Sequence, residues 1–185
     1  MKRVAILAGA FNPVTNAHLA LAKAAARMVD EVVCAVPRVY PHKHFHGAAL
    51  EDRIEMLTLA GGPYRIEPTN GGLFIDIARQ LHRPDSELLF VCGKDAAERV
   101  IDWDYGEPGA IEKMLANFSL LVAERAGTYQ PPAHLRHRVH HLDLDKDFSD
   151  VSSTEVRRRI AAGEPWEHLV PAAITDRVRR IYAAA

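Results

Sequence analysis

Four short apolar runs, separated by stretches with helical periodicity, constrain the fold of this chain more than any other feature. The runs are residues 4–8, 31–36, 87–92 and 118–123. A continuous apolar run of this length is typical of a strand that is buried on both faces of a parallel sheet. Between the runs, stripes such as Phe74, Ile77, Ala78 and Leu81 repeat at the spacing of one helix face. The alternation predicts an α/β fold, with a doubly wound, Rossmann-like and mostly parallel sheet and flanking helices.

The remaining elements continue this pattern along the chain. Weaker strands are expected at 64–67 and 139–142, and helices are expected over 18–29, 50–57, 108–116, 152–162 and 171–182. A chain of 185 residues suits one domain with a substantial core. We therefore expect a single domain over residues 1–185, in which residues 152–185 form a C-terminal helical part.

The composition excludes several classes of protein. Hydrophobic residues make up 48% of the chain and the formal net charge is −1, so no basic field points to nucleic acid or a membrane as a partner. The apolar run near the N-terminus is too short for a signal peptide, and no stretch approaches the ~18 apolar residues of a membrane span. Cys34 and Cys92 form no CxxC pair, which favours reduced thiols in a cytoplasmic protein.

The segment that follows the first strand has the features of a phosphate site. Ligands of doubly wound sheets bind outside the carboxyl ends of the strands, and here Gly9 allows the backbone to turn closely around a ligand. Asn12 and the proline after it favour a turn, and a helix begins near residues 16–18. Its free N–H groups and dipole would attract phosphate, and Thr15 and His18 could donate to phosphate oxygens. The alternative is that Asn16 merely caps this helix and His18 is an ordinary first-turn residue.

A second helix begins with a similar set of residues at Ser152. Ser152 and Glu155 fit a capping box, which by itself would explain a well-capped surface helix. A capping box does not explain the further hydroxyls of Ser153 and Thr154, or Arg157 one turn later. A helix N-terminus with hydroxyls and an arginine is a second anion site, and two such sites in one sheet suit a triphosphate. The next two arginines, Arg158 and Arg159, are interpreted as an exposed helix face.

These two segments together resemble the signatures of the nucleotidylyltransferase superfamily. Thr15-Asn16-Ala17-His18 is similar to its (T/H)xxH motif, and residues 151–157 are similar to its ISSTxxR motif. Within the superfamily the chain looks most like the nicotinate/nicotinamide mononucleotide adenylyltransferases. The matching features are the GxFxP turn at 9–13, the GxD segment at 93–95, a tryptophan at 103, a basic loop at 41–43, and 125–127, which is similar to an RPG segment.

The resemblance implies an enzyme that joins ATP to nicotinate or nicotinamide mononucleotide and releases pyrophosphate, a step of NAD biosynthesis. The catalytic residues it implies are Thr15, His18, Lys43 and Arg157. Those implied to bind ATP are Gly9, Ala10, Phe11, His18, Gly93, Asp95, Ser152, Ser153, Thr154 and Arg157. Those implied to bind the acceptor are Asn12, Lys43, Asp76, Trp103 and Arg125. Mg²⁺ would arrive with ATP, without a metal site of the protein's own.

Three positions depart from the family pattern. Ala17 replaces the usual glycine before His18, a second tryptophan is absent near Gly106, and residues 73–77 keep only Asp76 of a hydroxyl-rich YTxDT segment. Two alternatives therefore stay open. One is a sister transferase with a cytidylyl donor or with a phosphopantetheine or flavin acceptor, and the other is a non-catalytic nucleotide-binding module. A homo-oligomer is compatible with the sequence.

The basic loop also contains histidines at 42, 44 and 46, which alternate as the ligands of a metal could. Lys43 between them would repel a cation, and no further ligand lies at a typical spacing. A solvated basic loop is favoured over a metal site.

Overall fold

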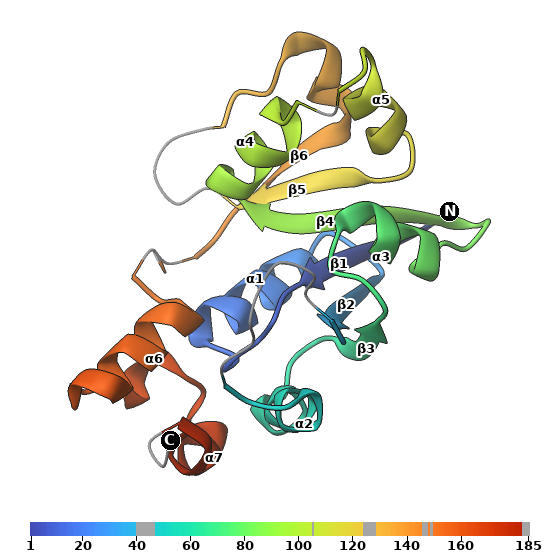
Figure 1. The fold of residues 1–185 in the computed structure, drawn as a ribbon. Coiled ribbons are helices and arrows are strands. Elements are labelled where there is room, and N and C mark those ends of the chain that lie inside the picture. Colours follow the sequence, from blue (N-terminus) through green and yellow to red (C-terminus); the bar gives the residue numbers. More distant parts are fainter. Residues whose placement is uncertain (40–46, 105, 124–128, 146–147, 149, 183–185) are drawn as a thin grey trace.

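Six parallel strands form one sheet in the order β3-β2-β1-β4-β5-β6 (Figure 1). This computed structural model describes residues 1–39, 47–104, 106–123, 129–145, 148 and 150–182. The strands are β1 (Lys2–Ala8), β2 (Glu31–Pro37), β3 (Arg65–Thr69), β4 (Ser86–Gly93), β5 (Ser119–Ala123) and β6 (Val139–Leu142). Both the parallel direction and the strand order confirm the doubly wound fold expected from the sequence.

Helices make the crossovers between these strands. They are α1 (Asn16–Ala26), α2 (Leu50–Ala60), α3 (Phe74–Leu81), α4 (Lys94–Asp102), α5 (Ala110–Leu115), α6 (Ser153–Ala162) and α7 (Thr175–Tyr182). Three short 3₁₀ turns join them: η1 (Ala133–Arg138), η2 (Glu167–Leu169) and η3 (Ala172–Ile174). Among the described residues, no helix combines the length and the apolar character needed to cross a bilayer.

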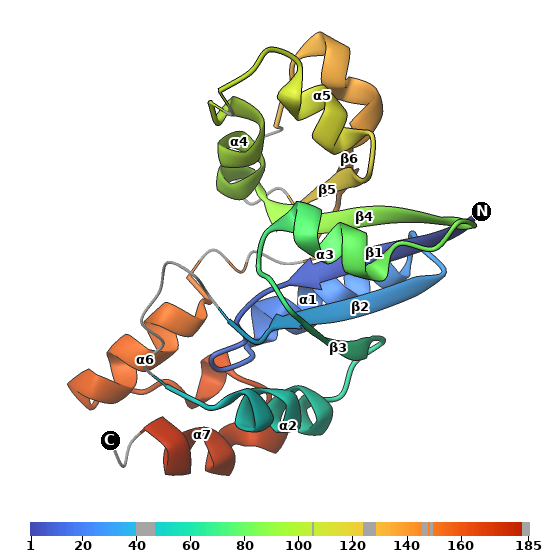
Figure 2. The same ribbon diagram turned by 45° about the vertical axis from the view of Figure 1, so that its right-hand side comes forward.

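The sheet separates two hydrophobic cores, one on each face. Alternate residues of a strand point to opposite faces, so Ala5 and Leu7 of β1 lie in the first core and Val4 and Ile6 in the second. The first core packs against α1, α2, α6 and α7, and the second against α3, α4 and α5. Figure 2 shows α1 and α3 on opposite sides of the sheet. Burial on both faces explains why the strand sequences are continuously apolar.

The crossover direction changes between β1 and β4, which are neighbours in the centre of the sheet. β1 pairs with β2 on one side and with β4 on the other, so that Ile6 lies opposite both Val33 and Phe90. The chain leaves β1 toward one edge of the sheet and leaves β4 toward the other. The segments that follow these two strands therefore diverge and form the crevice in which ligands of such sheets bind.

One helix differs from the sequence expectation. Helix α4 directly follows Gly93 and was not among the expected helices. In α2 the expected apolar stripe does face the first core, where Leu57 is fully buried and Leu50 packs against it. Arg53 is buried on this same face, which the stripe could not predict because hydrophobic periodicity treats arginine as a surface residue.

Candidate active site

The predicted phosphate site lies at the carboxyl end of β1, next to the point where the strand order reverses. Residues 9–15 connect β1 to α1, and α4 begins at the end of the neighbouring strand β4. The turn therefore stands at the crevice, with the N-terminus of α1 behind it. This position agrees with the one that the sequence predicted.

The turn holds Phe11 in an unusual backbone conformation. Phe11 has a φ of +49°, a left-handed value that bulky residues rarely adopt, and the peptide bond between Asn12 and Pro13 is cis. The Phe11 side chain is almost fully buried in the first core. Its ring centroid lies 5.0 Å from that of His18. Burial of the ring offsets the backbone strain, and the ring forms a fixed support for the imidazole of His18.

His18 is held in one tautomer by the start of its own helix. The backbone N–H of Thr15, the N-cap residue, donates to His18 Nδ1 at 3.0 Å. The Thr15 hydroxyl lies 2.8 Å from the same nitrogen. Because a backbone N–H can only donate, this hydrogen bond assigns Nδ1 as the acceptor and puts the proton on Nε2. His18 can therefore offer a neutral Nε2–H to a phosphate oxygen, which needs no protonated ring.

Asn16 is not the helix cap that the alternative interpretation assumed. Its side-chain Nδ2 donates to the carbonyls of His168 at 3.0 Å and Val170 at 3.3 Å. Thr15 takes the N-cap position instead. Asn16 thus ties the start of α1 to the segment around η2.

Helix α6 is joined directly to the turn, so the two predicted anion sites form one unit. Ser153 Oγ donates to the Pro13 carbonyl at 2.7 Å. Arg157 donates through Nη1 to the Asn12 carbonyl, and its Nη2 lies 3.5 Å from Thr154 Oγ1. Ser153 and Arg157 are four residues apart and so lie on one face of α6. This face points toward the turn.

The start of α6 also carries a cluster of charged residues, Glu155, Arg158 and Arg159, that does not contact the turn. Ser152 Oγ accepts from the Glu155 N–H at 3.1 Å, which is one half of the expected capping box. The reciprocal half is not formed, because the Glu155 carboxylate binds Arg158 and Arg159 instead. Hydrogen bonds from these two arginines lower the pKa of Glu155 to about 2. Arg158 is exposed, as its interpretation as part of an exposed face requires, whereas Arg159 is half-buried and also donates to the Pro165 carbonyl.

Arg53 is a buried residue of the site region that the sequence interpretation missed. Its side chain is only 3% exposed. Arg53 Nη1 donates to the Ala10 carbonyl at 3.1 Å, and Nη2 donates to the Pro37 carbonyl at 3.4 Å. These bonds link the turn after β1 to the end of β2 and help to hold Ala10 in place. An arginine next to an apolar helix stripe was the only signal in the sequence, and it is a weak one.

The predicted acceptor residues lie on other elements than the turn. Asp76 lies in the first turn of α3 and Asp95 in the first turn of α4. Asp76 approaches Arg79 at 3.7 Å. Trp103 ends α4 with 67% of its surface exposed. Lys43, the histidines at 42, 44 and 46, and Arg125 lie outside the described residues.

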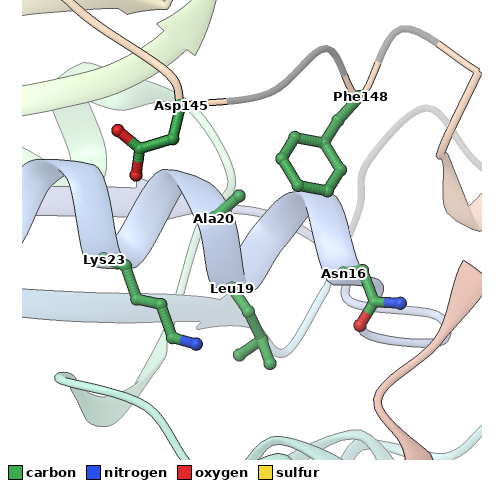
Figure 3. A pocket seen from close by; sticks show the side chains of 6 residues that line it. All are labelled: Asn16, Leu19, Ala20, Lys23, Asp145 and Phe148. Atoms are coloured by element: carbon green, nitrogen blue, oxygen red, sulfur yellow. The ribbon is translucent and has the colours of Figure 1, made fainter.

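A separate cavity of about 370 Å³ lies beside α1. It is lined by Asn16, Leu19, Ala20, Lys23, Asp145 and Phe148. Figure 3 shows Asp145 and Phe148 facing α1 from the connection between β6 and α6. None of the residues predicted to bind ATP or the acceptor lines this cavity, so it is distinct from the predicted site.

The donors around the turn suit an anion rather than a metal ion. In the part of the chain that the structure describes, no group of three or more His, Cys, Asp or Glu side chains could hold a metal. The His18 imidazole, the Arg157 guanidinium and the first amides of α1 and α6 are hydrogen-bond donors. Such a set recognises phosphate oxygens.

Comparison with known proteins agrees with this geometry. Residues 6–159 match the model of a family described as "Cytidylyltransferase-like". A protein of Frankia casuarinae is 33% identical and covers 97% of this chain and all of its own length. A protein of Geobacter sp. strain M21 is 30% identical and covers 99% of both chains. Each carries the name "Probable nicotinate-nucleotide adenylyltransferase".

Solved structures agree at the level of the fold. The Plasmodium falciparum nicotinic acid mononucleotide adenylyltransferase complexed with NaAD superposes with a TM-score of 0.73. It shares 18% sequence identity with this chain, and the match covers 97% of this chain and 95% of that one. The match to the family model and the identity to the two relatives show family membership in addition to the fold. The chain belongs to the cytidylyltransferase-like family of nucleotidyltransferases and, within it, to the nicotinate-nucleotide adenylyltransferases.

Proposed function

We propose that this enzyme transfers the adenylyl group of ATP to the phosphate of nicotinate mononucleotide. An oxygen of the acceptor phosphate forms a new bond to the α-phosphorus, the bond from that phosphorus to the β-phosphate bridging oxygen breaks, and pyrophosphate leaves. The observation that carries the proposal is the direct junction of the two helix starts predicted to bind phosphate, made by hydrogen bonds from Arg157 and Ser153 of α6 to the turn before α1. The names of the relatives supply the acceptor.

The residues around the turn have different proposed roles in this transfer. Transfer of this kind needs in-line positioning and stabilisation of charge more than a covalent nucleophile. His18 donates its Nε2–H to the phosphate that is attacked, and Thr15 holds the ring in that tautomer. Arg157 and, as a further proposal, Lys43 neutralise charge that develops on the phosphates. Gly9, Ala10, Phe11 and the amides of Ser152, Ser153 and Thr154 surround the rest of the triphosphate.

The remaining proposed contacts concern the two nucleosides and the metal. Gly93 and Asp95 would hold the ribose of ATP, and Asn12, Asp76, Trp103 and Arg125 would hold the acceptor. We propose that Mg²⁺ enters bound to the phosphates of ATP and keeps most of its waters, as this ion usually does with phosphate ligands. It would neutralise phosphate charge when bound.

The departures in residues 73–77 have a structural explanation. Phe74 stacks on Phe90 with ring centroids 4.4 Å apart, and Ile77 is fully buried. Both side chains therefore build the second core, in positions where the family has hydroxyls. We infer that the acceptor is held more by stacking and by its phosphate than by hydroxyl contacts from α3.

The wider setting is also a proposal. We propose a cytoplasmic location, in agreement with two buried free thiols. We further propose that residues 1–185 act as one domain, to which residues 152–185 contribute the second phosphate site. A homo-oligomer remains compatible with this arrangement.

Nucleotide preference tests the proposed donor. We expect ATP to raise the melting temperature more than CTP or GTP at equal concentration, because a ligand that binds only the native state stabilises it. Differential scanning fluorimetry measures this directly. Pyrophosphate release with ATP should then require nicotinate mononucleotide in a panel that also contains nicotinamide mononucleotide, phosphopantetheine and flavin mononucleotide. Equal protection by CTP, or turnover with another acceptor alone, would contradict the proposal.

Replacement of Trp103 tests the acceptor site. The indole is largely exposed and can stack on a flat pyridine ring, an interaction of about 1 kcal/mol beyond burial. Trp103→Ala should therefore raise the KM for nicotinate mononucleotide about 5- to 10-fold, while the KM for ATP stays nearly constant. Steady-state kinetics with each substrate varied in turn measures both values. A larger increase in the KM for ATP would show that Trp103 contributes to ATP binding, and the proposed acceptor contact would be wrong.

A further inference from the structure

The side chain of Asn12 joins three segments that lie far apart in the sequence. Asn12 is 4% exposed, and its Oδ1 accepts two hydrogen bonds. One comes from the Ala48 N–H at 3.1 Å, and the other comes from the hydroxyl of Tyr182 in α7. The Asn12 backbone carbonyl meanwhile accepts from Arg157 of α6. Asn12 is thus held by groups from outside the turn on both its side chain and its main chain.

Gly47 shows how closely the chain approaches this amide. It has a φ of +133°, and a Cβ built on it would lie 2.6 Å from Asn12 Nδ2. A side chain would strain the backbone and clash with Asn12. The backbone at 47–48 therefore packs directly against the amide, and the Ala48 N–H is directed at its oxygen. Any displacement of the Asn12 side chain would therefore weaken the hydrogen bond from the Ala48 N–H.

Helix α7 is a firm support for Tyr182. Val178 of α7 and Ile174 of the preceding turn η3 are fully buried in the first core. Arg177 donates to Asp52 of α2 at 2.7 Å and also to Glu55, and α7 lies beside α2 in both views (Figures 1 and 2). Burial raises the pKa of the Tyr182 phenol, so the hydroxyl keeps the proton that it donates to Asn12.

We infer that Tyr182 is a positioning residue for adenylyl transfer, which acts through the Asn12 side chain on the turn that carries Phe11 and His18. The inference rests on the proposed function. The Tyr182 hydroxyl restrains the Asn12 amide, the amide restrains Ala48, and the same residue presents its carbonyl to Arg157. The C-terminal helix thereby helps to place the phosphate-binding groups in register, although Tyr182 itself touches no substrate in this scheme.

Tyr182→Phe tests the inference with the loss of a single oxygen. We expect kcat to fall about 10-fold, because even a small misplacement of the reacting groups strongly lowers the rate of the transfer step. Tyr64→Phe is the matched control, because the Tyr64 hydroxyl donates at 2.8 Å to the Leu57 carbonyl of α2 and is not linked to the turn. Its kcat should stay within about twofold of wild type. A Tyr182→Phe enzyme with kcat within twofold of wild type would overturn the inference.

A double-mutant cycle shows whether Tyr182 acts through Asn12. If it does, Tyr182→Phe should have little further effect on kcat in an Asn12→Ala background, whereas independent residues give multiplicative losses. Multiplicative losses would overturn the inference. Asn12→Ser takes the place of Asn12→Ala if the alanine variant does not fold.

Hydrogen exchange supplies a readout that does not depend on the reaction. The Ala48 amide should exchange about 10-fold faster in Tyr182→Phe than in wild type and Tyr64→Phe, because the lost hydroxyl both restrains its Asn12 acceptor and itself faces the Ala48 N–H. If wild type forms no dinucleotide from nicotinate mononucleotide, the proposed function fails, and this exchange rate still decides whether the Tyr182 hydroxyl restrains the contact between Asn12 and Ala48. An unchanged rate at Ala48 would overturn that link.

Discussion

His18→Ala should lower the turnover number by about 100-fold or more, the largest effect that we expect from a single substitution. The loss of one preorganised donor to developing negative charge typically costs on the order of 100- to 1,000-fold. His18 is partly exposed at the start of α1 and does not belong to either hydrophobic core. Its removal should therefore spare the fold, and circular dichroism with a thermal melt checks this. Steady-state pyrophosphate release measures the turnover.

His18→Gln separates the chemical role of His18 from its role in the helix start. His18 takes the N3 position of a capping box, where glutamine is also favoured, and a glutamine oxygen can accept from the Thr15 N–H as Nδ1 does. We expect this variant to keep the wild-type melting temperature within about 2 °C. It should still lose most of the turnover, because one amide cannot both accept from Thr15 and reach the position of Nε2–H. Full activity in His18→Gln would show that only the helix cap matters.

Arg157→Ala should lower the turnover by a similar factor, about 100-fold, for two combined reasons. The guanidinium donates to the Asn12 carbonyl and so joins α6 to the turn. It also places a positive charge at the junction of the two predicted anion sites, and charge-assisted hydrogen bonds to phosphate are the strong ones. The same pyrophosphate assay measures this loss.

Arg158→Ala is the matched control for Arg157→Ala. Arg158 lies next to Arg157 in the sequence, yet its side chain pairs with Glu155 and Glu164 instead of the turn. Exposed pairs of this kind contribute little, so the turnover of Arg158→Ala should stay within about twofold of wild type. Equal losses in both variants would contradict the assignment of two functional faces to α6.

Arg157→Lys distinguishes the two reasons for the loss. Lysine keeps the charge but lacks the planar fork that can reach a carbonyl and a phosphate together. We expect an intermediate turnover, about 10-fold below wild type. Wild-type activity in this variant would mean that charge alone suffices and that the bond to Asn12 is incidental.

The sequence was most informative where a local pattern determines the structure. Continuous apolar strands predicted a parallel sheet covered on both faces, and the two cores confirm it. The order of glycine, turn, hydroxyl and histidine after β1 predicted a phosphate site, and in the structure this segment lies at the strand-order reversal. The roles of individual residues within that site stay predictions, which the substitutions above test.

Other features depended on partners that no local pattern reveals. Helix α4 escaped the sequence interpretation because its apolar stripe is short: Ala96, Ala97, Val100 and Ile101 face the second core but span fewer than two helical turns. The burial of Arg53 could not be expected, because an arginine enters a core only when specific carbonyls, here those of Ala10 and Pro37, compensate its desolvation. Glu155 likewise left its expected capping position for Arg158 and Arg159.

The sequence by itself determined the class of fold, the order of its elements and the two motifs that place this chain in its family, because these follow from periodicity and short-range spacing. Only the tertiary structure decided which groups meet. Arg157 reaches the carbonyl of Asn12 across 145 positions, and Tyr182 reaches the side chain of the same residue across 170. Such contacts form because packing of the first core brings α6 and α7 against the turn, and hydrogen-bond geometry then selects the residues that can pair.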